Sequence, residues 1–123
     1  MKQLDKIKAN LIDDKYQWTN HSLFKMRYYG LSQQRIKRII RYPSRVEEAI
    51  VPNMIAVMSP AGGKRYSEIW AMYKLAGRVI SKSQFKISKP KIIKIITAWR
   101  YPGKSPERNP IPKEILDEIK SLI

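Results

Sequence analysis

The spacing of apolar side chains along the chain changes near residue 45. Before this point apolar residues recur at helical intervals, beginning with Leu4, Ile7 and Leu11. Lys and Asp side chains fall between them and would face solvent. This pattern predicts an amphipathic helix over residues 3–15.

Two further helices are expected before residue 45. Thr19 or Asn20 can cap the first of them, because short polar side chains accept hydrogen bonds from the free N–H groups of a first turn. Gly30 stands where a left-handed residue ends a helix. Ser32 begins the next helix, which stops before Pro43 because proline disfavours a helical residue in front of it.

The second half of the chain is rich in Ile, Val, Tyr and Trp, which predicts strands. Turn-forming residues divide it into four runs: 45–51, 54–58, 64–74 and 91–100. Short turns join the first three, which are expected to form an antiparallel meander. The fourth run is apolar on both faces and is expected to be central in the sheet. Pro112 can open a closing helix whose apolar side carries Ile115, Ile119 and Leu122.

These elements predict an α+β fold, in which N-terminal helices pack on one face of a four-stranded, mainly antiparallel sheet and a short helix ends the chain. The 123 residues fit one domain, with residues 1–17 as an N-terminal helical extension and residues 102–123 as a proline-rich linker and last helix. The second sheet face would then be solvated or a binding surface. Its candidate side chains are Tyr66, Trp70, Tyr73, Lys94, Trp99 and Arg100.

The net charge of the chain indicates a binding partner. Lys and Arg number 25 against 10 Asp and Glu, a formal charge of +15. Such an excess destabilises a compact state through self-repulsion, so we expect a polyanionic partner. Nucleic acid, an anionic membrane and an acidic protein are the alternatives. A membrane fits least, because no apolar run approaches the roughly 18 residues of a span.

The charge is also unevenly distributed. Residues 15–45 hold eight basic and no acidic residues, and residues 69–106 hold nine basic and none acidic, whereas both ends are nearly balanced. The partner is therefore expected to meet the middle of the chain. The charged start predicts no secretory signal, and together with the absence of Cys this favours a cytoplasmic protein.

The candidate chemistry is limited by what the chain lacks. It has one His, no Cys and no phosphate-binding glycine loop, and most acids lie near its ends, so we expect neither a metal nor a cofactor. RNA cleavage remains possible, because the 2′-hydroxyl of RNA is itself the nucleophile and the protein need supply only a base, an acid and positive charge. His is the side-chain type best suited to act as a base or an acid near neutrality, and the single His21 shares a helix face with Lys25. The other cations proposed to act with them are Arg27, Arg65 and Arg100.

Further residues are candidates for nucleic-acid binding. Phosphate contacts are expected from Arg35, Lys37, Arg38, Arg41, Lys64 and Lys94, and base stacking from Tyr73, Trp99 and Tyr101. Several of these residues also have a purely structural interpretation. The helix cations can form a solvated face, His21 can be a surface or capping residue, and Trp70 and Trp99 are favoured as buried residues, since each lies in an apolar strand.

Two segments resemble a known family. Residues 18–43 contain His, then Lys-Met, then Gly-Leu-Ser between two helices, and finally Pro; this resembles the opening of small toxin-like proteins of the RelE and BrnT kind. Residues 92–102, IIKIITAWRYP, are similar to the last strand of those proteins. The resemblance, over residues 18–101, implies a barnase-like or RelE-like sheet and a metal-independent endoribonuclease that acts on RNA, often messenger RNA on the ribosome. It also implies a DNA-binding antitoxin as partner. By motif position, His21 and Thr97 correspond to the family's helix His and last-strand Thr or Ser.

The resemblance makes a toxin-like ribonuclease the leading hypothesis. A non-catalytic nucleic-acid-binding protein and a basic module that binds an acidic protein are the alternatives. Thr97 is also explained by its preference for strands alone.

Overall fold

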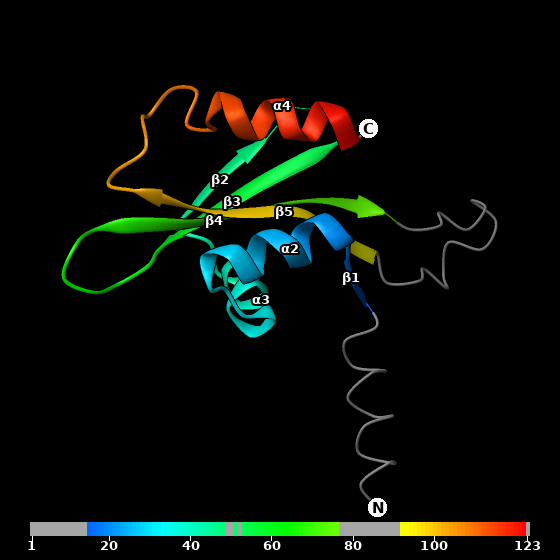
Figure 1. Cartoon of the computed structure of the whole chain (residues 1–123), viewed down its shortest axis with the longest axis horizontal. Coiled ribbons are helices and arrows are strands. Elements are labelled where there is room, and N and C mark those ends of the chain that lie inside the picture. The colour runs from blue at the N-terminus through cyan, green and yellow to red at the C-terminus, as the bar shows by residue number, and fades with distance from the viewer. Residues whose placement is uncertain (1–14, 49–50, 52, 77–91, 123) are drawn as a thin grey trace, which may run out of the picture.

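The computed structural model describes residues 15–48, 51, 53–76 and 92–122 (Figure 1). The helix expected over residues 3–15 lies outside these residues, apart from its last position. Most of the basic loop between the third and fourth expected strands, which runs from Leu75 to Pro90, also lies outside them.

The described residues form one five-stranded sheet with the strand order β1-β5-β4-β3-β2. The strands are β1 (Tyr16–Trp18), β2 (Arg45–Glu48), β3 (Met54–Pro60), β4 (Ser67–Ala76) and β5 (Ile92–Pro102). The antiparallel meander of the first three expected strands is confirmed as β2, β3 and β4. The mixed α+β class is also confirmed, and β5 lies inside the sheet, as expected.

The expected count of four strands is wrong, because β1 was missed. This strand has only three residues, too few to show an alternating pattern, and it pairs parallel to β5 with Tyr16 opposite Ile93. Its partner lies more than 70 residues later, so nothing local to β1 marks it as a strand. Parallel pairing across such a distance is decided only when the whole sheet assembles.

A bulge in β5 decides which side chains face each side of the sheet. Met72 of β4 lies opposite Thr97 and Tyr73 lies opposite Ile95, which leaves Ile96 as the extra residue. Ile96 consequently packs on the same side as Trp99, although strict alternation would place it with Ala98. Buried side chains thus alternate irregularly along β5.

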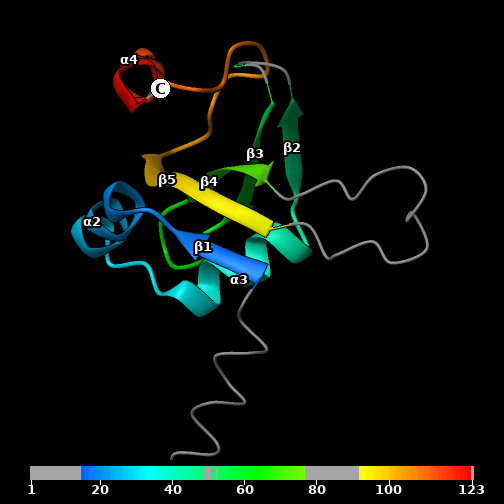
Figure 2. The same cartoon turned by 90° about the vertical axis from the view of Figure 1, so that its right-hand side faces the viewer.

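Both faces of the sheet are covered by helices. One face packs against α2 (Asn20–Tyr29) and α3 (Gln33–Arg41), whose Met26, Ile36 and Ile39 belong to the same buried cluster. The other face packs against α4 (Lys113–Leu122), as Figure 2 shows. There Ile115 and Ile119 join a cluster built on Trp70 and Trp99, whose parallel rings lie 5.7 Å apart. The face expected to be free of helices is therefore covered, which corrects the predicted arrangement.

The two helices before β2 begin and end where their local sequence indicates. Thr19 caps α2, and Gly30 follows it at φ 69°, a conformation that glycine adopts without the steric cost of a Cβ. Ser32 caps α3 by accepting a hydrogen bond from the Arg35 N–H at 3.1 Å. Three residues separate the helices, so their ends lie close together.

Helix α2 lies beside β5 next to the short β1 strand (Figure 2). Its Met26 joins the α3-side cluster, whereas its Tyr29 packs against both clusters. Beyond Ile95, β5 is paired with β4 but no longer with β1, and this position lets α2 shield the edge that β1 leaves open. It also brings α2 within reach of α4.

Candidate nucleic-acid interface

The position of His21 is set by the residue that starts its helix. The Thr19 hydroxyl accepts a hydrogen bond from the Ser22 N–H at 3.0 Å and donates to the Ile95 carbonyl at 2.9 Å. The Ile96 carbonyl lies 3.2 Å from the same hydroxyl. Thr19 thus joins the N-terminus of α2 to the bulge of β5.

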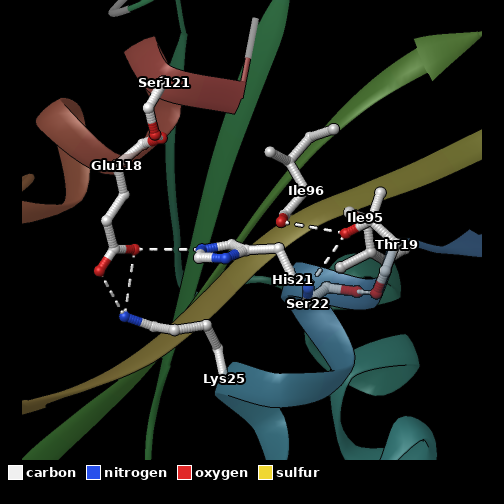
Figure 3. Close-up of polar contacts among 8 residues, drawn as sticks. All are labelled: Thr19, His21, Ser22, Lys25, Ile95, Ile96, Glu118 and Ser121. Atoms are coloured by element: carbon white, nitrogen blue, oxygen red, sulfur yellow. Dashed lines mark hydrogen bonds and ion pairs between the residues drawn. The ribbon is translucent and has the colours of Figure 1, made fainter.

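One carboxylate of α4 contacts both His21 and Lys25 of α2 (Figure 3). Glu118 Oε2 lies 3.2 Å from His21 Nε2, and Glu118 Oε1 lies 2.9 Å from Lys25 Nζ. The Lys25 ammonium also lies 5.4 Å from the centre of the Tyr29 ring. His21 and Lys25 therefore share a helix face, as their spacing indicated, and both face α4.

Glu118 was not among the predicted site residues, because the acids of the last helix were assigned to a separate, balanced terminus. It neutralises Lys25, so with a neutral imidazole the three side chains carry no net formal charge. The apolar positions Ile115 and Ile119 were the signal that α4 packs on the sheet. They could not indicate what Glu118 would meet.

Two of the predicted site residues lie inside the core. Thr97 has no exposed surface and Trp99 is 2% exposed. Neither side chain can touch an RNA in this conformation, so their assignment to catalysis and to base stacking is corrected to a buried structural role. Trp99 stacks on Trp70, in agreement with the structural interpretation of both tryptophans.

Arg65 and Arg100 come together at the far end of α2. They line a hollow of about 480 Å³ together with Tyr29, Tyr66, Ser67, Pro102 and Gly103. Arg100 Nη2 donates a hydrogen bond to the Tyr29 carbonyl at 3.2 Å. Arg100, from the second basic block, thus meets the C-terminal end of α2, whereas Arg65 belongs to neither block.

The remaining strand and turn candidates are dispersed. Tyr73 packs against the cluster on the α3 side and Tyr101 against the cluster on the α4 side. Burial, and then the negative charge of Glu48, raise the pKa of Tyr73. Lys64 is exposed in the turn before β4, and Lys94 is half-buried on β5. These residues do not form one site.

Four predicted phosphate-binding residues belong to α3: Arg35, Lys37, Arg38 and Arg41. Arg38 and Arg41 are exposed, whereas the other two are held at the flanks of the helix. Arg35 Nη2 donates to the Ala61 carbonyl at 2.6 Å, and Lys37 Nζ lies 5.2 Å from the centre of the Tyr16 ring. Ile36 and Ile39 face the sheet, so the outer side of α3 is polar and basic.

Two hollows adjoin this outer side and share Gln34, Arg38 and Tyr42. One, of about 400 Å³, lies between α3 and the end of β3 and includes Arg35. The other, of about 560 Å³, includes Lys37 and Arg41. Among the described residues that line them, none is acidic. We call the four cations and Tyr42 the α3 basic surface.

The buried acid Glu68 has a structural role away from this surface. It is 1% exposed and accepts hydrogen bonds from Trp70 Nε1 and the Tyr66 hydroxyl at 3.0 Å each, and from the Ser105 N–H at 3.3 Å. Burial opposes ionisation, but the hydrogen bonds from Ser105, Trp70 and Tyr66 outweigh it and hold the pKa of Glu68 below its ordinary value. Through the hydrogen bond from Ser105, the Glu68 carboxylate holds the segment before α4 against the sheet.

No protein-family model matches this chain, and neither does any curated protein or solved structure. Over the part of the chain that the structure describes, no helix is long and apolar enough to cross a membrane. Nor does that part bring three His, Asp or Glu side chains together as metal ligands. The candidate interface therefore rests on the geometry of α2, α3 and their neighbours.

Proposed function

We propose that this protein binds RNA through the α3 basic surface. The observation that carries the proposal is the pair of adjoining hollows whose described lining contains four cations and no acid. Cations one turn apart on a helix repel each other, and phosphates bound beside them would offset that cost.

Tyr42 favours RNA as the nucleic acid. Its side chain is 71% exposed and lines both hollows next to Arg38. An aromatic ring beside a guanidinium plane suits contact with unpaired bases, which are the usual target in RNA recognition.

The test is the salt dependence of binding. Wild-type protein and the variants Arg38→Ala and Arg41→Ala are titrated with an RNA oligonucleotide between about 50 and 200 mM salt. Binding is expected to weaken steeply with salt, and each variant should reduce the slope of log K against log salt by about 0.7 to 0.9, the value for one phosphate contact.

Arg108→Ala is the matched control, since Arg108 is an exposed cation in the segment that leads to α4, on the other face of the sheet. It should leave the slope unchanged. Salt-independent binding, no binding, or equal effects of all three variants would overturn the proposal.

Ribonuclease activity is a second candidate function, and the line of polar residues along α2 favours it. The imidazole of His21 is held by Glu118, and Lys25 lies beside the Tyr29 ring. Tyr29 in turn accepts the hydrogen bond of Arg100. In this proposal His21 takes the 2′-hydroxyl proton, the 2′-oxygen attacks the adjacent phosphorus, and cations stabilise the phosphorane. The bond from phosphorus to the 5′-oxygen then breaks, and that oxygen takes a proton from water. The resemblance to RelE-like toxins supports the same reaction, with the ribosome as a possible location and an antitoxin as a protein partner.

This second function is tested by incubating the protein with total RNA and with ribosomes in EDTA and mapping new ends. His21→Ala and Arg100→Ala should abolish or weaken cleavage. Glu118→Gln tests whether Glu118 acts by positioning the His21 imidazole. Because the glutamine keeps an oxygen near His21, this variant should retain part of the activity. Intact RNA with folded wild-type protein would exclude the ribonuclease and leave the binding proposal standing.

A further inference from the structure

Two large aromatic side chains stand out from the surface of α2. Phe24 is 61% exposed and Tyr28 is 74% exposed, although both belong to a well-packed helix. They lie four residues apart, so they are neighbours on the same side of the helix, with Arg27 exposed beside them. We call Phe24, Arg27 and Tyr28 the α2 aromatic face.

This face is separate from the surfaces that α2 uses in folding. Ser22, Lys25 and Met26 are buried on the side of the helix that meets β5 and α4. The Tyr28 and Tyr29 rings meet edge to face, with centroids 4.9 Å apart at 89°, and Tyr28 remains 74% exposed. Packing among the described residues therefore does not account for the two exposed rings.

We infer that the α2 aromatic face stacks unpaired bases of a single-stranded RNA, an inference that rests on the proposed RNA binding. Rings at positions i and i+4 are about 5 to 6 Å apart at their Cβ atoms, so neighbouring bases can each cover one ring. Arg27 supplies a cation for the connecting phosphate or a second plane for a base. Single-strand binding requires aromatic planes and positive charge. The α2 aromatic face supplies both.

The surroundings favour a polyanion over a protein as the occupant. Residues 15–45, which include α2 and α3, contain no Asp or Glu. The two rings are also flanked by exposed Arg27 and Asn20, so they do not form the continuous apolar centre of a stable protein interface, which buries about 800 Å² on each partner. A base has a flat face of the size of one ring and needs no such area.

The proposed stacking site lies on a helix, whereas the sequence alone predicted base stacking by strand residues. Trp99, the tryptophan predicted from sequence to stack on bases, is 2% exposed and lies beneath α4. Helical spacing from other apolar residues predicts Phe24 to be a core residue, but its side chain is 61% exposed.

The test compares single-stranded with double-stranded RNA of equal phosphate number. Wild-type protein should prefer the single strand. Phe24→Ala and Tyr28→Ala should each weaken binding of the single strand about 10-fold, the size expected for one lost stacking contact. Both should leave duplex binding within about 2-fold, because paired bases are not available to the rings.

Matched variants separate stacking from other effects. Tyr28→Phe keeps the ring and should bind as wild type. Phe24→Leu keeps an apolar side chain without an aromatic face and should lose affinity as Phe24→Ala does. Since both residues are exposed, the variants should retain the wild-type free energy of unfolding to within about 0.5 kcal/mol.

Unchanged single-strand affinity in the alanine variants would overturn the inference and point to a protein as the occupant of this face. An equal loss for single strand and duplex would overturn it as well. In either case the Arg38→Ala and Arg41→Ala measurements still decide the proposed RNA binding, so the two failures are distinguishable. If the wild-type protein bound no RNA at all, both the proposed RNA binding and the stacking inference would be overturned.

Discussion

Glu118 Oε1 lies 2.9 Å from Lys25 Nζ, which joins the last helix of the chain to a side chain 93 residues earlier. Lys25 is 8% exposed, and a buried ammonium is stable only with a partner. The ion pair thus couples the packing of α4 to the position of α2. Both the proposed ribonuclease residues and the α2 aromatic face depend on that position.

Removing Glu118 should destabilise the protein through Lys25. Glu118→Ala leaves the ammonium without its carboxylate and is expected to lower the free energy of unfolding by about 1 to 2 kcal/mol. This is less than the roughly 3 kcal/mol typical of a fully buried pair, because about a third of the Glu118 side chain is exposed. Urea denaturation monitored by circular dichroism measures the change.

Lys25→Met provides the control for this effect, since it removes the charge and keeps an apolar side chain of similar length. In the Lys25→Met background, Glu118→Ala should cost less than it does in the wild type. Equal costs in both backgrounds would show that the ion pair contributes nothing to stability.

Glu68 should make stability depend on pH in the acid range. Its folded-state pKa lies below the ordinary 4.5, so its contribution is fully present above the pKa of the unfolded chain and is lost as pH falls through the lower, folded-state value. The free energy of unfolding, measured in urea at several pH values between neutrality and strong acid, should fall over this window.

Glu68→Gln tests the origin of that loss. The variant should be less stable at neutral pH by about 1 to 3 kcal/mol, the cost of replacing a charged acceptor among buried donors. Its stability should also fall less steeply with acid than that of the wild type. Parallel pH curves for the two proteins would assign the acid sensitivity to other carboxylates.

Trp70 and Trp99 should respond differently to the same substitution. Trp70 Nε1 donates to Glu68 Oε1 at 3.0 Å, whereas Trp99 Nε1 is buried without a hydrogen-bond partner among the described residues. Trp70→Phe therefore loses packing and the indole hydrogen bond to Glu68 Oε1. Trp99→Phe also loses packing, but it removes an unsatisfied polar group. Trp70→Phe should be the more destabilising by about 1 kcal/mol or more, as measured by denaturant unfolding. The opposite order would contradict the assigned hydrogen bonds.

Thr19 should contribute more than an ordinary helix cap. Thr19→Ala removes the acceptor for the Ser22 N–H and also the hydroxyl that donates to the Ile95 carbonyl. A cap alone contributes about 1 kcal/mol, so the loss in the free energy of unfolding should exceed that value.

Ser32→Ala is the matched variant, because Ser32 caps α3 through the Arg35 N–H, an exposed contact. It should cost about 1 kcal/mol or less. Thr19→Ser keeps the hydroxyl and should recover most of the stability lost in Thr19→Ala. Equal costs at the two caps would mean that the link to β5 adds no stability.

Local sequence by itself determined the helices and most strands of this protein. Thr19, Gly30 and Ser32 act on backbone groups within a few residues of themselves, so the bounds of α2 and α3 can be read without the rest of the chain. The β2–β3–β4 meander follows in the same way from short turns. The same reasoning gave the basic character of α3, because alternation of Ile and Arg at helical spacing separates a buried from an exposed side.

Tertiary structure alone decided which surfaces of these helices and strands pack against one another. The three-residue strand β1 exists only because β5 offers it an edge, and the extra residue Ile96 decides which β5 side chains meet α4. Packing of α4 on the second sheet face buries Trp99 and places Glu118 between His21 and Lys25. The pairing of β1 with β5 and the contacts of Glu118 with His21 and Lys25 join residues more than 70 positions apart. Their partners are selected by the shape and charge of the assembled sheet, which no local pattern of the sequence contains.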